Sequence, residues 1–475
     1  MSKKEFPGNM ISNYGDEIPG SQVRTAPSKR ERKLKSEESR GNSGNGCDSK
    51  PGNHHRQSRY TRLQTMDETS QVHDLVIVGA GLAGLAIAAA MHKIGVNSVI
   101  LEQSSTLRST GAALTLWSNA WRVLDALGVG DQLRRMHPLI TGIRMRNMQG
   151  ELLKGFQLEE SPGGHTETRC VERKILAQTL ASVLPKGTIR FDSRVVSIAR
   201  ESESGPFQLA LSNGSLVRSK ILIGADGVNS VVAKWMGLAP ARYAGYMGIR
   251  GLAEYQEEHS HEFALTQYIG SGTRIGILPT SRTRVFWFLV YNKAHPDAKY
   301  TDPKVVKEEM MGHLKGFPEV LRDMLDRTPM ETLSRAPIMD RWNLPGRAPV
   351  VQNCVSLAGD AFHPMTPNLG QGGCCAMEDS IALARTLGPV LVHGGNPNPR
   401  VISEALEEYA AERNRRTLVV TVISFILGFL LMIAFRPFVY LRDNYLLPKF
   451  FTRTTFLSQT LYDPGQLPDT KTVAK

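Results

Sequence analysis

The chain has few cysteines and no arrangement of them that suits a metal site. Its 475 residues include five cysteines, with no CxxC pair and no flanking set of histidines. They are Cys47, Cys170, Cys354, Cys374 and Cys375. Scattered thiols in odd number are typical of a reducing compartment. We therefore expect neither a structural metal nor a disulfide framework.

The body of the chain also lacks an excess of charge of either sign. The net charge of the whole chain is +12, yet residues 66–412 carry 35 basic and 35 acidic residues. The excess lies at the two ends, +6 over residues 1–65 and +6 over residues 413–475. A neutral body argues against a nucleic-acid groove, whereas basic ends suit a membrane surface or acidic partners.

The first 70 residues have too few aliphatic side chains to form a core. They are rich in Ser, Gly, Asn, Lys and Arg, and we predict a disordered basic tail over residues 1–70. The basic cluster from Lys29 to Lys35 is either solvated tail or a targeting address. No apolar run here is typical of a secretory signal, and the acidic residues are unusual for a transit peptide. Translation from an internal start at Met66 would remove the tail and leave the predicted folded part intact.

One strand, tight turn, helix and second strand are predicted between Asp74 and Glu102. The apolar run from Leu75 to Val78 shows no polar alternation, which is typical of a parallel strand buried on both faces. The returning strand over residues 99–101 ends at Glu102, whose carboxylate can accept hydrogen bonds from both hydroxyls of a ribose.

Three glycines with GxGxxG spacing fill the turn of this unit. Gly79 allows the turn, Gly81 allows the backbone to approach a pyrophosphate, and Gly84 allows close packing of helix on strand. Free N–H groups at the start of the helix can then bind phosphate. Because strand, glycines, helix and acid stand at the required offsets, the unit predicts a dinucleotide site.

A second, β-rich region interrupts the predicted α/β domain. After helices over residues 117–127 and 172–184, short strands are predicted at 188–192, 195–200, 207–211 and 215–223, with an Asn213-Gly214 hairpin. Residues 245–292 are β-rich and aromatic, and the parallel pattern returns at Val350. We therefore predict one α/β domain in two segments, over 71–240 and 341–412, an inserted β-rich domain over 241–340, and a C-terminal segment over 413–475.

Two further glycine–acid clusters follow buried strands. The first contains Asp226 and Gly227, and the second pairs Gly359 with Asp360 before a helix that starts at Gly370 to Gly373. With these motifs in order over about residues 73–412, the sequence resembles the single-component, FAD-dependent aromatic-ring-type (class A) monooxygenases, especially plant members related to zeaxanthin epoxidase. The resemblance implies an α/β fold, in which a Rossmann-like FAD-binding domain carries an inserted β-rich substrate domain, as in hydroxybenzoate hydroxylase.

The resemblance also implies a set of cofactor-binding residues. These are Gly79, Gly81, Ala83, Gly84, Glu102, Arg173, Asp226, Gly227, Asp360, Gly370, Gln371, Gly372 and Gly373. In the family, Arg173 would lie beside the flavin and Asp360 would bind the ribityl chain, although Asp360 could instead cap a helix. Lys234 stands where the family often has an arginine for the reductant. The helix at Gly372 would direct N–H groups at the flavin N1 and C2 carbonyl.

The implied chemistry belongs to FAD rather than to a set of catalytic side chains. In the family, NAD(P)H transfers hydride to FAD, O2 adds at the flavin C4a, and one oxygen atom passes to a small aromatic or lipophilic substrate. A reductase or halogenase on the same scaffold, or a membrane-attached flavin-binding protein without oxygenase activity, remains an alternative.

Several other side chains have two possible roles. His363 could relay a proton or simply be a satisfied loop histidine, and Cys374 and Cys375 could be redox-active or small packing residues. Phe286 and Phe288 alternate with Trp287 along a strand, so one or two of these rings could face the substrate, unless all serve the core.

The C-terminal stretch over residues 417–435 contains no charge. As a helix it would be about 28 Å long, against roughly 30 Å of membrane hydrocarbon. Thr417, Thr421, Ser424 and Gly428 recur on one narrow stripe, which suits packing on another helix. We predict a hydrophobic helix that associates with a membrane, either spanning it or lying at its surface, with packing on the FAD domain as the alternative.

Overall fold

The computed structural model describes residues 71–107, 112–158, 166–202, 205–297, 302–344, 351–392, 397–452, 454 and 457–469. The statements that follow concern these residues. The tail predicted over residues 1–70, with its basic cluster and Met66, lies outside them.

The apolar runs form a mainly parallel sheet, as the sequence predicts. In spatial order its strands are β16 (Val351–Gln352), β17 (Val355–Leu357), β10 (Leu216–Gly224), β1 (Val72–Val78), β2 (Val99–Leu101) and β7 (Ile189–Arg190). The five strands from β17 to β7 are parallel, while β9 (Phe207–Leu211) and β8 (Val195–Arg200) add an antiparallel extension beside β10. The predicted hairpin between β9 and β10 is confirmed, with Gly214 at φ +85°.

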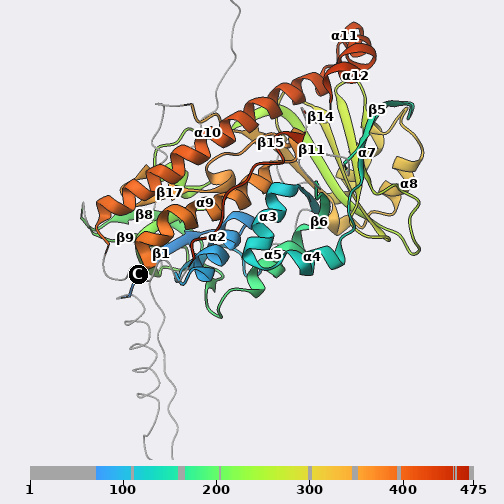
Figure 1. The fold of residues 1–475 in the computed structure, drawn as a ribbon. Helices are drawn as coiled ribbons and strands as arrows, with labels where there is room; N and C mark the ends of the chain where they lie inside the picture. Colours follow the sequence, from blue (N-terminus) through green and yellow to red (C-terminus); the bar gives the residue numbers. More distant parts are fainter. Residues whose placement is uncertain are drawn as a thin grey trace, which may run out of the picture. The chain divides into compact units, whose positions relative to one another are not determined.

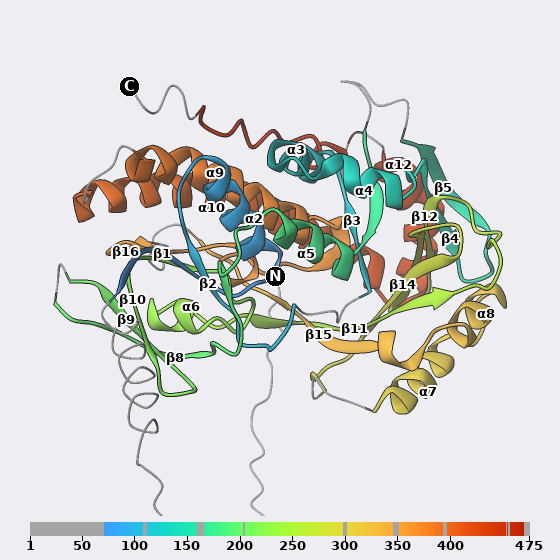
Figure 2. The ribbon, with the colours of Figure 1, turned by 90° about the horizontal axis from the view of Figure 1, so that it is seen from below.

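Helices cover this sheet and bring distant parts of the chain together. Helix α2 (Leu82–Lys93) contacts α9 (Gly372–Val392), which in turn contacts α10 (Pro399–Met432). Figure 2 shows these three helices on the same face of the parallel strands. The remaining helices of this part are α3 (Ser118–Leu127), α4 (Gly130–Met136), α5 (Arg173–Ser182) and α6 (Val231–Trp235). Residues 82–91 of α2 are all buried, because their small and aliphatic side chains fit between sheet and helices.

A second, seven-stranded sheet corresponds to the predicted β-rich region. Its order is β15 (Ser334–Asp340), β11 (Arg242–Glu254), β14 (Arg284–Asn292), β13 (Thr273–Pro279), β12 (Ala264–Ile269), β4 (Gly142–Asn147) and β5 (Leu152–Gln157). The last two strands come from a segment that the sequence assigned to the FAD-binding part, so the sheet draws on more of the chain than residues 241–340. Helices α7 (Pro303–His313) and α8 (Val320–Asp326) pack on its far face through a separate hydrophobic core.

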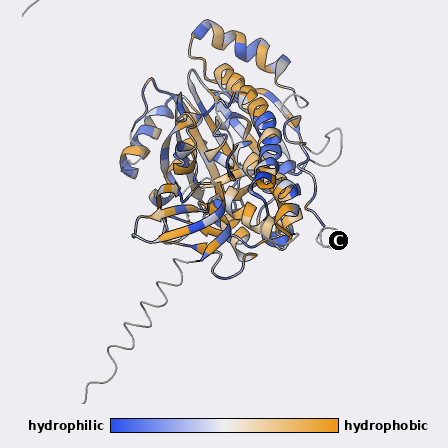
Figure 3. Cartoon of the chain, turned by 90° about the vertical axis from the view of Figure 1, so that its left-hand side faces the viewer, coloured by the Kyte–Doolittle hydropathy of each residue, from blue (hydrophilic) through white to orange (hydrophobic). Residues whose placement is uncertain are grey.

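The charge-free C-terminal stretch is the second half of one 34-residue helix. Helix α10 starts at Pro399 and continues through residues 412 and 413, where the sequence suggested a boundary, and it ends at Met432 rather than at 435. It runs from the parallel sheet towards the seven-stranded sheet (Figure 1). Hydrophilic residues dominate its first half and hydrophobic residues its second (Figure 3). Helix α11 (Arg436–Leu441), the π-helical turn η4 (Arg442–Leu446) and α12 (Leu447–Phe450) follow.

Candidate functional site

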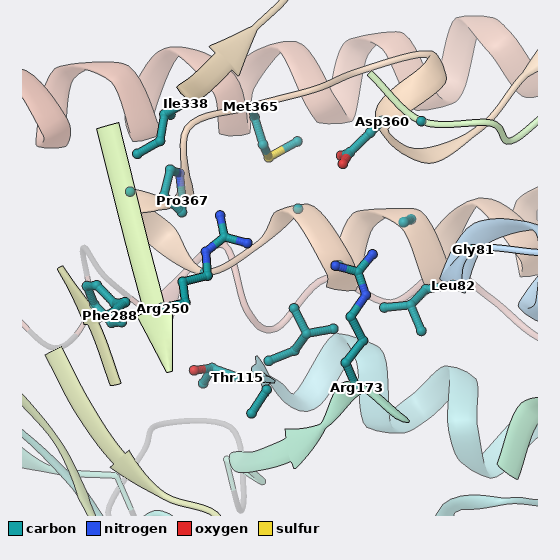
Figure 4. A pocket seen from close by; sticks show the side chains of 18 of the residues that line it. Gly81, Leu82, Thr115, Arg173, Arg250, Phe288, Ile338, Asp360, Met365 and Pro367 are labelled. Atoms are coloured by element: carbon teal, nitrogen blue, oxygen red, sulfur yellow. The ribbon is translucent and has the colours of Figure 1, made fainter. Parts of the chain in front are cut away.

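A cavity of about 290 Å³ lies between the glycine motifs and the seven-stranded sheet. We call its first side the glycine wall, which consists of Gly81, Leu82, Ala83, Ala225, Gly227, Asp360, Gly370, Gly372, Gly373 and Ala376. We call its second side the sheet wall, which consists of Gly248, Ile249, Arg250, Phe286, Phe288, Leu289, Val290 and Ile338. Strand β3 (Ala113–Leu116), Arg173, Met365 and Pro367 complete the lining (Figure 4).

The three glycines after β1 have distinct physical requirements. Gly79 has φ +102°, and a Cβ there would lie 2.7 Å from the Ala225 carbonyl oxygen. A Cβ on Gly84 would lie 2.0 Å from the carbonyl oxygen of Gly79, so helix and turn can pack only without it. At Gly81 the nearest protein atom would be 3.8 Å away. Gly81 therefore keeps room open in front of the first turn of α2, whereas Gly79 and Gly84 permit the turn itself.

The Glu102 carboxylate stabilises the glycine turn by accepting backbone hydrogen bonds. Its side chain is 5% exposed, and Oε2 accepts a hydrogen bond from the Ala80 N–H at 2.8 Å. Oε1 accepts from the Ser104 N–H at 2.9 Å. Each oxygen has a second lone pair, so the carboxylate can fix the turn and still accept from a ribose hydroxyl.

The first acid–glycine pair lies where β10 leads into α6. Asp226 Oδ2 accepts from the Val231 N–H at 2.7 Å, while Oδ1 is buried and has no hydrogen-bond partner among the described residues. Burial raises the pKa of Asp226. Gly227, at φ +84°, turns the backbone along the cavity. A buried acceptor without a partner at this edge fits a ligand that donates a hydrogen bond.

Asp360 presents a free carboxylate to the cavity. It lies on the short helix η2 (Gly359–Ala361), its side chain is exposed, and it makes no side-chain hydrogen bond among the described residues. The alternative role of helix cap therefore finds no support in the geometry. Figure 4 shows Asp360 and Arg173 on opposite sides of the cavity, each extending inward.

The N-terminus of α9 borders the cavity without side chains in the way. A Cβ on Gly372 would lie 3.7 Å from Met365 Cγ, and one on Gly373 would lie 3.5 Å from a Leu114 methyl carbon. The protein would tolerate either Cβ, so the glycines serve to leave space in the cavity. Gln371 is different, because its side chain is 1% exposed and its Oε1 accepts from Asn119 Nδ2 at 2.8 Å. Its side chain points into the interior, and only its backbone can serve this site.

A buried ion cluster supports the loop that carries Asp360. Asp379 on α9 accepts hydrogen bonds from the Gly359 N–H at 2.7 Å and from Arg413 Nε at 2.7 Å. Arg413 on α10 also pairs with Glu378 at 2.6 Å, and all three charged side chains are fully buried. Burial alone would raise the pKa of Asp379, but His363 and Arg413 lower it below its usual value. Helix α10 thereby fixes the position of Asp360.

For several side chains that have two possible roles by sequence, the structure favours one of the two. His363 is 2% exposed and its Nε2 lies 2.8 Å from Asp379 Oδ2, so it belongs to the ion cluster and does not line the cavity. Cys374 and Cys375 are buried, and burial raises the pKa of Cys374 to about 12, which fits packing rather than redox chemistry.

The three aromatic residues of β14 divide between the two faces of the seven-stranded sheet. Phe286 and Phe288 line the cavity. Trp287 is fully buried in the core with α7 and α8, and its Nε1 donates to Thr328 Oγ1 at 2.9 Å. Alternation along the strand therefore assigns two rings to the site and one to the core.

The sequence reasoning missed Arg250. Arg250 lies on β11 and lines the cavity. In the sequence it follows Met247 to Ile249 and precedes Gly251 and Leu252, none of which is charged. The available signal was a single charge inside a strand whose neighbours are apolar. Such a charge must either have a partner or face a solvated cavity.

Together, these features fit a flavin dinucleotide. The free helix N-termini of α2 and α9, the unpaired acceptors of Asp226 and Asp360, and the room at Gly81 and Gly372 suit phosphates, hydroxyls and a planar ring. All of the sequence-predicted residues lie at or directly behind this cavity. Of the thirteen, Gly79, Gly84, Glu102, Asp226 and Gln371 are not part of its lining.

Comparisons with known proteins agree with this fit. A family model described as FAD binding domain matches residues 72–421. Monooxygenase 2 of Arabidopsis thaliana is 36% identical over 372 residues, which cover 75% of this chain and 89% of that protein. Chloroplastic zeaxanthin epoxidase of an Oncidium hybrid cultivar is 27% identical over 365 residues, covering 73% of this chain and 53% of the epoxidase.

Solved structures share the fold. HpxO of Klebsiella pneumoniae, complexed with FAD and uric acid, has a TM-score of 0.69 at 24% identity, covering 82% of this chain and 96% of that one. These matches confirm the resemblance drawn from the three motifs.

Proposed function

Because this chain belongs to the FAD binding domain family of flavoprotein monooxygenases, we propose that it consumes NAD(P)H and O2 to insert one oxygen atom into a small aromatic or lipophilic substrate. The observation that carries the proposal is the cavity with two unlike walls, one fitted for a dinucleotide and the other mostly apolar. Bound FAD would supply the redox chemistry and the activation of oxygen.

The glycine wall would bind and orient the cofactor. The N-termini of α2 and α9 provide N–H donors for the pyrophosphate and for the pyrimidine edge of the flavin, where negative charge gathers on reduction. Asp360, Asp226 and Glu102 would accept hydrogen bonds from cofactor hydroxyls and amines. Arg173, the first residue of α5, borders the same space and would offer donors to phosphate.

The sheet wall would hold the substrate and exclude water. Phe286 and Phe288, with ring centroids 6.2 Å apart and ring planes tilted by 41°, supply an apolar aromatic surface. Phe288 is held by Arg274, whose guanidinium lies 5.6 Å from its ring centroid and donates to Asn368 Oδ1 at 2.8 Å. A dry wall of this kind protects reactive oxygen species at the cofactor from water.

The test is spectroscopic and chemical. The purified full-length protein should carry FAD, should oxidise NAD(P)H, and should do so faster with a substrate of the correct class. Under 18O2 the product should gain one labelled oxygen atom. A reductase would oxidise NAD(P)H without labelling its product, and a halogenase would need halide; either result contradicts the oxygenase assignment.

The C-terminal helix supports a second proposal, association with a membrane surface. Among the described residues α10 is the one helix long and apolar enough to cross a membrane. Its stripe of Thr417, Thr421, Ser424 and Gly428 is buried within the protein: Ser424 Oγ and Thr366 Oγ1 lie 2.8 Å apart, and Asn368 fills the space beside Gly428. One face of α10 packs against residues beside the site. We therefore favour a helix that lies at the membrane surface over one that spans the membrane.

The opposite face of the same helix is apolar and exposed. Val419, Ile426 and Phe429 are 47%, 60% and 60% exposed, and Phe435 is 70% exposed beyond the helix end. Exposed Arg415 and Arg436 flank this surface. Apolar side chains between arginines suit the boundary of an anionic membrane.

Vesicle flotation tests this second proposal. The protein should float with vesicles containing phosphatidylserine, and the double variant Ile426→Glu, Phe429→Glu should not. Val401→Glu is the matched control, because Val401 is 45% exposed on the hydrophilic half of α10. Alkaline carbonate should release an interfacial protein, so retention in the carbonate pellet would show that the helix spans. Absence of flotation would contradict membrane association altogether.

A further inference from the structure

The last described segment of the chain lies across the helices that carry the flavin site. We call residues 457–467 the C-terminal strap. It runs back from α12 past α3 (Figure 2). Leu457 and Thr460 are 3% and 1% exposed, and Leu467 packs against the main hydrophobic core. From residue 461 onward the strap forms neither helix nor strand, yet part of it is buried.

The carbonyl oxygens of this irregular segment need donors from elsewhere in the protein. Arginines from three helices supply them at 2.5–3.2 Å: Arg122 of α3 donates to Leu461 and Tyr462, Arg385 of α9 to Pro464, and Arg416 of α10 to Gln459. The strap is therefore tied to α3, α9 and α10 at once.

Arg416 joins the strap to the buried ion cluster. Its Nη1 donates to Gln459 Oε1 at 2.7 Å, and its guanidinium lies 4.6 Å from the centroid of the Tyr462 ring. On its other side, Nη2 lies 3.3 Å from Glu378 Oε1. The side chains of Arg416 and Glu378 are 9% and 0% exposed. Arg416 thus divides its donors between the strap and α9.

Asn119 carries this connection to the start of α9. Its Nδ2 donates to Glu378 Oε1 at 2.5 Å and to Gln371 Oε1 at 2.8 Å. Its backbone N–H donates to the Thr460 carbonyl oxygen of the strap at 3.0 Å. The strap therefore holds Asn119 in two ways, directly through Thr460 and indirectly through Arg416 and Glu378.

Gln371 fixes the first turn of α9. Its carbonyl oxygen accepts the first helical hydrogen bond, from the Cys375 N–H at 2.8 Å. The N–H groups of the next residues, Gly372 and Gly373, have no acceptor within the helix, and both glycines line the cavity. A shift of this turn would change how well these N–H groups stabilise the negative charge of a reduced flavin.

We propose that the C-terminal strap positions the N-terminus of α9 for the reduced flavin, with Arg416 as the positioning residue. This inference rests on the proposed function and adds an element that raises the reduction potential of the flavin. As far as the chain is described, the lining of the cavity contains no residue of the strap. The strap therefore acts through α9 and not by contact with cofactor or substrate.

The first experiment compares two neighbouring arginines in the full-length protein. The reduction potential of bound FAD is measured anaerobically against redox dyes, and FAD affinity is measured by titration of apoprotein. Arg416→Gln should weaken binding of reduced FAD relative to oxidised FAD by about tenfold, which lowers the potential by about 30 mV for a two-electron couple. Arg416→Lys should recover only part of this loss, because an ammonium lacks the planar fork of donors.

Arg415→Gln is the matched control. It removes the same charge one residue earlier, on the exposed side of α10. The potential should stay at the wild-type value. An equal fall in both variants would mean that loss of positive charge, and not the hold on the strap, lowers the potential, which would overturn the inference.

The second experiment removes the strap itself. Deletion of residues 457–475 should lower the potential as Arg416→Gln does, whereas deletion of residues 470–475 keeps the strap and should change nothing. Combining the longer deletion with Arg416→Gln should cause no further fall, because both remove the same interaction. If the shortened chain does not fold, Gln459→Ala takes its place; it removes one acceptor of Arg416 and should give a smaller fall in the same direction.

The outcomes separate this inference from the proposed function. An unchanged potential in Arg416→Gln, or lower thermal stability without a change in potential, would overturn the inference and leave the function intact. Additive falls from the deletion and Arg416→Gln would show that strap and arginine act separately, which also overturns it. Wild type that takes up no FAD would refute the proposed function, and the inference with it.

Discussion

The two walls of the cavity are built in different ways. The glycine wall consists of strand-to-helix turns whose backbone groups face the cavity, so its chemistry depends on glycine spacing over short stretches of sequence. The sheet wall consists of residues from three strands, β11, β14 and β15, and the side chains among them that face the cavity come from positions far apart in the chain. Backbone recognition suits a constant cofactor, whereas side-chain recognition can differ from one substrate to another.

This difference explains what could be predicted from the sequence. The turn at Gly79 needs a positive φ and Gly84 admits no Cβ, so both leave a local signal. The strands and helices of the parallel sheet likewise follow from apolar runs bounded by glycine and acid. Consequently the strands and helices around the two glycine motifs, β1 to β2 and β17 to α9, follow the expected order.

The sheet wall left no comparable signal. Which of the three aromatics on β14 faces the site depends on the register with β11 and on the α7–α8 layer, neither of which is local. Arg250 lies in none of the sequence motifs, and the ion pairs of Arg413 with α9 join residues 34 and 35 positions apart. For the same reason the sequence divided α10 at residue 412, although Arg413 belongs to the support of the glycine wall.

The largest effect should come from removing that support. Arg413→Ala leaves buried Glu378 and Asp379 without their common partner, and we expect a loss of about 3–5 kcal/mol in the free energy of unfolding, together with loss of FAD. Denaturant unfolding checks this. Arg400→Ala is the control, because its pair with Glu404 is exposed and should change stability by less than about 1 kcal/mol. Equal effects of the two variants would mean that α10 does not support the site.

The next effect concerns two acids, Asp360 of the glycine wall and Glu102 behind the glycine turn. Asp360→Ala should weaken FAD binding by about 1.5–3 kcal/mol without changing the unfolding midpoint of the apoprotein, because Asp360 makes no hydrogen bond through its side chain to any of the described residues. Glu102→Ala should weaken FAD binding and also lower stability, since it frees the Ala80 N–H. FAD titration of apoprotein and thermal unfolding measure the two quantities. Full FAD occupancy in both variants would refute the assignment of this wall.

A bulkier residue at the start of α9 should impair placement of the flavin ring without impairing binding of the phosphates. Gly372→Val adds side-chain volume where the flavin ring is expected, at a cost of roughly 1–3 kcal/mol to ring placement. We expect slower reduction of bound flavin by NAD(P)H, with pyrophosphate binding at α2 preserved. Stopped-flow reduction is the measurement, and Gly312→Val is the control because a Cβ there meets nothing within 4 Å. Normal reduction kinetics would place the flavin ring elsewhere.

The smallest effect should be confined to the sheet wall. Phe288→Leu removes an aromatic contact of about 0.5–1.5 kcal/mol, which should raise KM for an aromatic substrate and leave FAD affinity unchanged. Steady-state NAD(P)H oxidation against substrate concentration, with FAD titration beside it, tests this. Weaker FAD binding in this variant would show that the two walls do not divide cofactor from substrate.

One measurement tests the central claim most directly. Purified full-length protein is made anaerobic, NAD(P)H is added, and oxygen is then admitted while the visible absorbance of the bound flavin is followed. We predict stoichiometric FAD, bleaching on addition of NAD(P)H, and recovery of the oxidised spectrum with O2. Protein that is colourless as purified and takes up no FAD, or flavin that NAD(P)H does not bleach even with candidate substrates present, would contradict the account.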